Sequence, residues 1–128
     1  MNEILRGIAA ASLGAVGKND TGTLQGRFLF TESFAGFAGH FPGYPILPAI
    51  VQILTVAALV GEAAGCRQRL VAVEDAKFLS PVLPGQQLLV RCRPRTLKGK
   101  PLYDAQLTVG ERTSASLLLE LAPFQESP

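Results

Sequence analysis

Residue types that mark several protein classes are scarce in this chain. It has two cysteines, Cys66 and Cys92, one histidine, and a net charge of only +2 from 12 basic and 10 acidic residues. So small a net charge excludes nucleic acid as the main partner. The cysteines lack metal-ligand spacing, so we expect no metal site. They fit a reducing compartment, with a disulfide left open, and we expect both thiols to be buried or unreactive.

Long hydrophobic runs without polar interruption are also missing. The most apolar stretch, residues 46–64, contains Gln52 and Glu62, which favours a buried core helix over a membrane span. The first residues carry Glu3 and Arg6 and no leucine-rich segment, so we expect no signal peptide. With 48% hydrophobic and 17% charged residues, the composition predicts one ordered domain rather than a disordered chain. The reducing compartment that the cysteines fit makes the cytoplasm the expected location.

Proline and glycine bracket one long helix, predicted over residues 49–64. Pro48 suits the first turn, where its missing N–H costs nothing, and Gly65 suits the left-handed position that ends a helix. Because this helix is apolar nearly all round, it should be buried on most sides. A shorter helix is expected over residues 3–11, and residues 14–22 are expected to form a loop.

The rest of the chain alternates between apolar and polar residues, as strands do. Residues 31–45 are rich in Gly, Phe and Pro and predict an ordered loop, which contains His40. One long buried helix followed by three or four meandering antiparallel strands is an α+β arrangement in which a curved sheet wraps the helix. The expected strands are 23–30, 70–78, 88–95, 103–109 and 115–121, with turns at 81–85, 98–100 and 110–112.

Two segments carry recognisable motifs. Residues 39–49 read Gly-His-Phe-Pro-Gly-Tyr-Pro-Ile-Leu-Pro-Ala, and residues 76–88 read Ala-Lys-Phe-Leu-Ser-Pro-Val-Leu-Pro-Gly-Gln-Gln-Leu. They resemble the two signatures of the β-hydroxyacyl-acyl-carrier-protein dehydratase family: a GHFPG box leading into the central helix, and a strand ending in a P-x-x-P-G turn. The resemblance implies a hot-dog fold as a single domain over residues 1–128, with a divergent N-terminal segment at 1–22.

The resemblance also implies a mechanism on a 3-hydroxyacyl thioester. His40 occupies the position of the base that acts at C2. Ala49, where the family usually has glycine, occupies the position whose backbone N–H binds the thioester carbonyl as charge grows on its oxygen. The residues expected to contact substrate are Phe41, Gly43, Pro45 and Leu54.

The family's acid has no counterpart in this sequence. In the family a Glu or Asp from the partner subunit's helix, fourteen positions after the histidine, protonates the departing hydroxyl; here that position is Leu54. Gln52 should face another side of the helix, Thr55 is too weak an acid, and Glu62 lies about 12 Å along the helix. The sequence alone does not place Glu32, Glu74 or Asp75.

Three functions follow. The first is a (3R)-hydroxyacyl-acyl-carrier-protein dehydratase-like lyase in fatty-acid or related lipid or polyketide synthesis. The second is a non-catalytic or impaired hot-dog subunit that binds acyl chains or pairs with an active partner, and the third is an acyl thioesterase. We expect a carrier-protein or CoA thioester as ligand, a homodimer or an oligomer of dimers, and no organic cofactor.

A basic strand face is a candidate for docking the carrier. Arg91, Arg93 and Arg95 share one side of their strand, with Lys98 and Lys100 close by in the sequence. Such a face complements an acidic carrier protein. The plainer interpretation is a solvated outer strand face.

Overall fold

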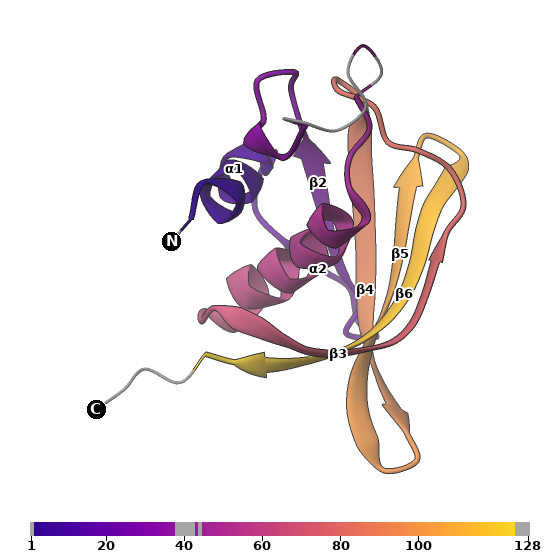
Figure 1. Ribbon diagram of the computed structural model, residues 1–128. Helices are drawn as coiled ribbons and strands as arrows, with labels where there is room; N and C mark the ends of the chain where they lie inside the picture. Colours follow the sequence, from indigo (N-terminus) through magenta and orange to yellow (C-terminus); the bar gives the residue numbers. More distant parts are fainter. Residues whose placement is uncertain (1, 38–42, 44, 125–128) are drawn as a thin grey trace.

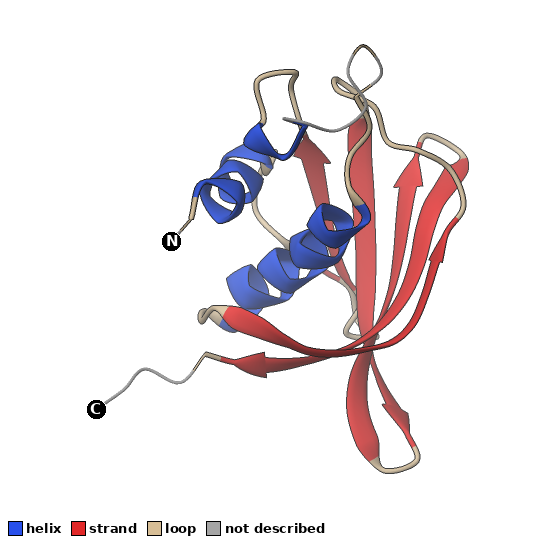
Figure 2. Ribbon diagram, in the orientation of Figure 1, coloured by secondary structure: helices blue, strands red, loops and turns tan. Residues whose placement is uncertain are grey.

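The fold is a six-stranded antiparallel sheet that curves around one long helix (Figures 1 and 2). The computed structural model describes residues 2–37, 43 and 45–124. The predicted hot-dog arrangement is confirmed. The elements are α1 (Glu3–Ala11), β1 (Gly17–Lys18), β2 (Leu24–Leu29), the 3-10 helix η1 (Ala35–Phe37), α2 (Ala49–Ala64), β3 (Gln68–Phe78), β4 (Gln87–Leu97), β5 (Lys100–Val109) and β6 (Arg112–Pro123).

The strand order differs from a simple meander. The order is β1-β2-β4-β5-β6-β3, so β4, β5 and β6 follow one another as expected, but β3 is not beside β4. Strand β2 pairs with β4 instead, from Leu24 opposite Cys92 to Leu29 opposite Gln87. Of the expected three or four meandering strands, the three-strand alternative is confirmed and the four-strand alternative is wrong, because alternation within a strand does not specify its neighbour. Strand β3 pairs with β6 and forms one edge of the sheet.

Helix α2 is bounded by Pro48 and Gly65, the two residues that the sequence indicates as its ends. Pro48 is the N-cap rather than a residue of the first turn, and Gly65 ends the helix in the left-handed conformation with φ 75°. Val56 and Leu59 are completely or almost completely buried against the sheet, whereas Ile50 is 52% exposed. The helix is thus buried on the side that faces the sheet and open at its N-terminal end. Among the described residues, no helix is long and apolar enough to cross a membrane.

Helix α1 is fixed to the segment that leads into the first motif. Its N-cap Asn2 accepts a hydrogen bond from the Leu5 N–H at 2.8 Å. The ring of Phe34 lies only 2.6 Å from where a Cβ on Gly7 would be, and it contacts Phe30 and Phe37 at ring-centre distances of 4.7 and 5.7 Å. This packing orders the chain up to η1. The expected helix over 3–11 is confirmed, and the expected loop over 14–22 contains the two-residue strand β1.

Candidate functional site

A groove of about 440 Å³ lies at the N-terminus of α2. One wall comes from the chain entering α2 and its first turn, and the other comes from the end of β3 and the loop that follows. The two motif segments therefore meet there, although they are far apart in the sequence. The lining residues are Ile46, Leu47, Ala49, Gln52, Phe78, Leu79, Ser80 and Pro81.

Backbone hydrogen bonds hold the two walls together. The Leu47 N–H donates to the Val82 carbonyl at 2.8 Å, and the Leu79 N–H donates to the Ser114 carbonyl, also at 2.8 Å. Ser80 donates through its hydroxyl to the Thr113 carbonyl at 3.0 Å. The loop of the second motif is thus bonded on one side to the start of α2 and on the other side to β6.

The first turn of α2 brings backbone N–H groups to the edge of this groove. The first N–H groups of any α-helix have no partner inside the helix, and the N-cap Pro48 makes no side-chain capping hydrogen bond. Ala49, the first residue of the helix, is exposed. Because the N-terminal end of a helix carries partial positive charge, an oxygen that gains negative charge is favoured at this position.

The predicted site residues fall into three groups. His40 and Phe41 lie outside the described residues. Gly43 is exposed and has φ 80°, a left-handed conformation that favours glycine, and Pro45 is half-buried on the approach to the groove. Ala49 lines the groove itself.

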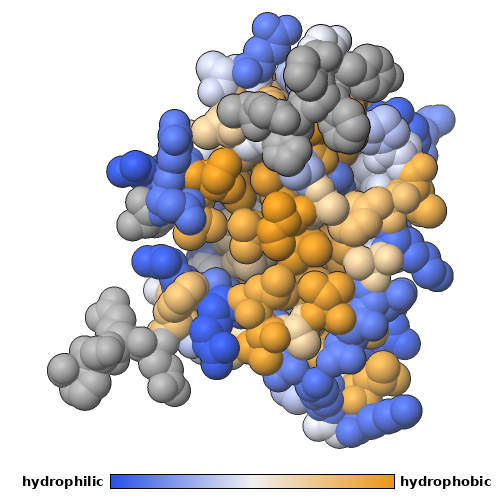
Figure 3. All heavy atoms as spheres, in the orientation of Figure 1, coloured by the Kyte–Doolittle hydropathy of each residue, from blue (hydrophilic) through white to orange (hydrophobic). Residues whose placement is uncertain are grey.

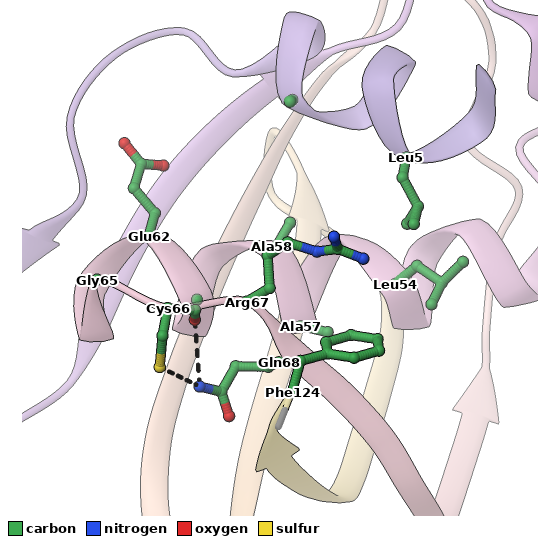
Figure 4. Close-up of a pocket in the computed structure, with 12 residues that line it drawn as sticks. Leu5, Leu54, Ala57, Ala58, Glu62, Gly65, Cys66, Arg67, Gln68 and Phe124 are labelled. Atoms are coloured by element: carbon green, nitrogen blue, oxygen red, sulfur yellow. Dashed lines mark hydrogen bonds between the residues drawn. The ribbon is translucent and has the colours of Figure 1, made fainter. Parts of the chain in front are cut away.

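Leu54 lines a different cavity. It is half-buried in a pocket of about 410 Å³ between α1, the outer side of α2 and the start of β3 (Figure 4). Leu5 enters from α1, and the Phe124 ring, with the Arg67 guanidinium 4.7 Å from its centre, closes one side. Among the described residues that line it, Glu62 is the one carboxylate. Within one chain, Leu54 and Ala49 therefore do not share a pocket.

The other polar residues of α2 are already engaged. The Thr55 hydroxyl is fully buried and donates to the Val51 carbonyl at 2.7 Å. Gln52, which is 3% exposed, donates to the Leu47 carbonyl and accepts from the Ser114 hydroxyl. Both facts agree with the expectation that neither side chain substitutes for an acid at Leu54. Sequence reasoning missed Ser114 because no motif contains it.

The basic strand face carries ion pairs across the outer surface of the sheet. Arg93 and Arg95 lie 3.5 and 3.3 Å from Oδ2 of Asp104, and Arg91 donates to Gln25 at 3.3 Å. The Lys100 ammonium forms ion pairs with Glu74 and Glu120. These contacts raise the pKa of Lys100, and the hydrogen bond to Glu74 contributes most. These contacts fit the plainer of the two interpretations, in which the basic residues form a solvated outer strand face with pairs between neighbouring strands.

The two cysteines differ. Cys92 is buried as expected, and burial, followed by the nearby Asp104 carboxylate, raises the pKa of its thiol to about 12. Cys66 is exposed, so of the two expected alternatives, buried or unreactive, burial is wrong for it; it lies just after the end of α2 and lines the pocket that contains Leu54. Both are free thiols.

In the described part of the chain no three His, Cys, Asp or Glu side chains are grouped closely enough to hold a metal ion.

Known structures share this arrangement. The chain superimposes on the dehydratase heterocomplex ApeI:P from Xenorhabdus doucetiae with a TM-score of 0.71 at 22% identity, over 87% of this chain and 96% of that one. An uncharacterised protein from Erwinia carotovora subsp. atroseptica gives a TM-score of 0.66 at 26% identity, over 91% and 98% of the two chains. At 22% identity the first likeness supports the hot-dog fold alone.

Sequence comparisons identify the family. The 3-hydroxyacyl-acyl-carrier-protein dehydratase FabZ of Granulibacter bethesdensis is 32% identical over 113 residues, which cover 76% of this chain and 66% of that protein. FabZ of Acidiphilium cryptum is 36% identical, over 70% of this chain and 62% of that protein. The chain thus matches a little under two thirds of each relative's length. The family model for the ApeI dehydratase matches residues 17–116, a span that contains both motif segments, the groove and α2, so the chain belongs to the ApeI-like dehydratase family.

Proposed function

We propose that this chain is a (3R)-hydroxyacyl thioester dehydratase-type lyase that acts in the groove at the N-terminus of α2. The observation that carries the proposal is the exposed first turn of α2 at Ala49, which has no side-chain cap and follows the GHFPG box of residues 39–43. The site favours a negatively charged oxygen next to an apolar wall formed by Phe78 and Leu79. A thioester carbonyl attached to an acyl chain has this combination of groups.

The proposed chemistry is an elimination of water. His40 removes the proton from C2, and the electron pair forms the C2–C3 double bond as hydroxide leaves C3. The thioester oxygen gains negative charge while C2 loses its proton, and the Ala49 N–H stabilises that charge. The departing hydroxide takes a proton from solvent water, and His40 releases the proton from C2 to solvent, so the products are a 2-enoyl thioester and water and His40 is regenerated.

Leu54 is the reason to expect a weak enzyme. Its half-buried side chain can neither donate a proton nor hold a water in place, and loss of a positioned acid costs about 10²–10⁴ in rate. In the proposed reaction, solvent water protonates the leaving group. The same residue favours a second candidate function, a subunit that binds acyl thioesters and is catalytically impaired.

The assembly that we propose is a dimer formed through the edge strand β3 and the open side of α2. Figure 3 shows hydrophobic atoms gathered over the middle of the face on which α2 lies. Ile50 is 52% exposed on that helix, and Phe78 is 42% exposed at the end of β3. Exposed sheet edges and large apolar patches are normally covered in the assembled protein.

The partner is a second copy or a related subunit. The ApeI:P complex of Xenorhabdus doucetiae is a heterocomplex, which makes a related hot-dog chain the alternative partner. A cytoplasmic location and an acyl-carrier-protein or CoA thioester as substrate complete the proposal. The acyl thioesterase remains a third candidate, with Glu62 as the carboxylate in the second pocket.

A pair of variants tests the proposal. Purified protein is assayed with 3-hydroxyacyl-pantetheine, and formation of the conjugated 2-enoyl thioester is followed by its ultraviolet absorbance. We expect slow turnover that His40→Ala abolishes. Leu54→Glu should raise the rate by some part of the factor of about 10²–10⁴ that a missing acid costs, because the apolar surroundings keep the new carboxyl protonated.

Other results point to the other functions. Binding without turnover in the wild type and in both variants indicates an impaired subunit. Release of free thiol indicates a thioesterase. Turnover that is unaffected by His40→Ala contradicts the dehydratase mechanism described above.

A further inference from the structure

Gln52 has an unusual place among the buried residues. Its side chain is 3% exposed, it lies in the first turns of α2, and it also lines the groove. A buried amide is costly unless it is hydrogen-bonded. Its partners therefore show what holds it in the core.

The first partner is the residue before the N-cap. Gln52 Nε2 donates to the Leu47 carbonyl at 3.5 Å, while the Gln52 backbone N–H donates to the Pro48 carbonyl at 3.2 Å. The Leu47 N–H is bonded to Val82 at 2.8 Å. Leu47 is thus held on both sides, two residues before Ala49. Since Pro48 makes no side-chain cap, Gln52 supplies the side-chain contact that fixes the entry into α2.

The second partner is Ser114 on β6, which supports the opposite wall of the groove. The Ser114 hydroxyl lies 3.4 Å from Gln52 Oε1 and 3.1 Å from the Leu107 carbonyl. The Ser114 carbonyl in turn accepts from the Leu79 N–H. One buried amide therefore connects the start of α2, through β6, to the loop that forms the other wall of the groove.

We propose that Gln52 is a positioning residue that fixes where the Ala49 N–H points in the groove. The inference rests on the proposed function for its consequence, carbonyl recognition, and on the geometry of Leu47, Gln52 and Ser114 for its physical basis. Without the amide, Leu47 keeps its bond to Val82 but loses its second anchor. The first turn of α2 then samples other orientations.

Two isosteric changes on the same helix give the test. Gln52→Met keeps the length and the unbranched shape of the side chain and removes both polar atoms. Thr55→Val is the matched control, because Thr55 is also fully buried but its hydroxyl bonds only within its own helix, to Val51. Ser114→Ala is a second variant that removes the opposite anchor, for use if Gln52→Met fails to fold.

Amide hydrogen exchange tests, without any ligand, whether the Gln52 side chain holds Leu47 in place. We expect protection of the Leu47 amide to fall about three- to tenfold in Gln52→Met, the size of one net hydrogen bond, and to be unchanged in Thr55→Val. The Leu107 amide, on β5, reports changes in overall stability. Equal protection of Leu47 in Gln52→Met and Thr55→Val would overturn the proposal.

Ligand affinity tests whether Gln52 positions the Ala49 N–H for binding a carbonyl oxygen. Two pantetheine compounds are compared, a saturated S-acyl thioester and the matching S-alkyl thioether, in which a methylene replaces the carbonyl. Gln52→Met should lower affinity for the carbonyl compound about three- to tenfold and leave the methylene compound unchanged. Equal losses for both compounds indicate a merely structural role and also overturn the proposal. If the wild type binds neither compound, the proposed function fails, and hydrogen exchange alone decides whether the anchor exists.

Discussion

At the scale of single residues, the surroundings of a thiol decide whether it reacts. The thiolate is the reactive form, and burial in apolar surroundings raises the pKa at which it forms. Cys92 is a residue of β4 whose side chain lies in the core, with its pKa raised to about 12. Cys66 is exposed beyond the end of α2. The two cysteines of one chain should therefore behave differently toward the same reagent.

Alkylation measures this difference. At pH 8 in native buffer, iodoacetamide should modify one thiol per chain, and Cys66→Ser should remove that reaction. Both thiols should react in denaturant. Because the folded-state pKa of Cys92 is raised, its contribution to stability is complete below about pH 9 and is lost as the pH rises toward 12. Two rapid modifications of the native protein at pH 8 would contradict the burial of Cys92.

The candidate site shows how far the sequence determines single residues. Ala49 was predicted correctly as a residue at the start of the helix, because the motif and Pro48 lie next to it in the chain. The contact between Gln52 and Ser114 was not predicted. These residues are 62 positions apart, and their meeting depends on the register of β6 beneath α2, which no local pattern specifies.

At the scale of elements, one close contact between α2 and the sheet requires a glycine. Gly26 lies in the middle of β2, and a Cβ added there would lie 2.6 Å from Cδ1 of Leu59 and 3.5 Å from the Phe28 ring. Leu59 is 1% exposed, so its side chain has little room to move away. Interiors are packed too densely to accept even one extra carbon without strain.

Gly26→Ala should therefore destabilise the fold by about 1–3 kcal/mol through overpacking. The control is Gly17→Ala in β1, where the nearest atom to an added Cβ is 3.7 Å away, an ordinary contact. That change should be neutral or slightly stabilising, because it reduces the freedom of the unfolded chain. Thermal or urea unfolding measures both variants. If Leu59 is the cause, Gly26→Ala should cost less in a Leu59→Ala background.

Strand positions were largely predicted from local signals, and strand neighbours were not. The turn at Lys98 and Gly99 has φ values of 52° and 76°, the left-handed pair that a two-residue hairpin demands, and glycine there is visible in the sequence. By contrast, no local sequence signal indicates that β3 pairs with β6. Register shifts between Leu70 and Ala72 and between Val73 and Asp75 also change which residues face inward, so simple alternation fails along this strand.

At the scale of the whole molecule, the inner face of the sheet is only partly covered. Val73 is opposite Leu119, and Phe78 is opposite Ala115. Directly opposed residues of an antiparallel pair lie on the same face of a sheet, and Leu119 and Ala115 are fully buried. Val73 and Phe78 therefore lie on the inner face, yet they are 43% and 42% exposed. Helix α2 of the same chain therefore leaves them partly uncovered.

A dimer through this edge explains the uncovered residues and can be tested by mutation. Val73→Lys should weaken dimerisation on the order of a hundredfold, because about one buried valine is lost from each of two symmetric copies. It should have little effect on folding, since Val73 is already exposed in the single chain. Leu97→Lys is the matched control: Leu97 is 40% exposed but lies on β4, which β5 and β6 separate from the β3 edge.

Light scattering at micromolar concentration measures the outcome. Wild type and Leu97→Lys should have about twice the single-chain mass of 13.6 kDa, and Val73→Lys should approach that single-chain mass. A wild-type monomer would contradict assembly of the chain with itself and leave a related subunit as the partner, which co-expression and co-purification would then reveal. A Val73→Lys variant that remains fully dimeric would move the interface away from β3. Because the proposed acid position comes from the partner's helix, loss of the dimer should also abolish any gain from Leu54→Glu.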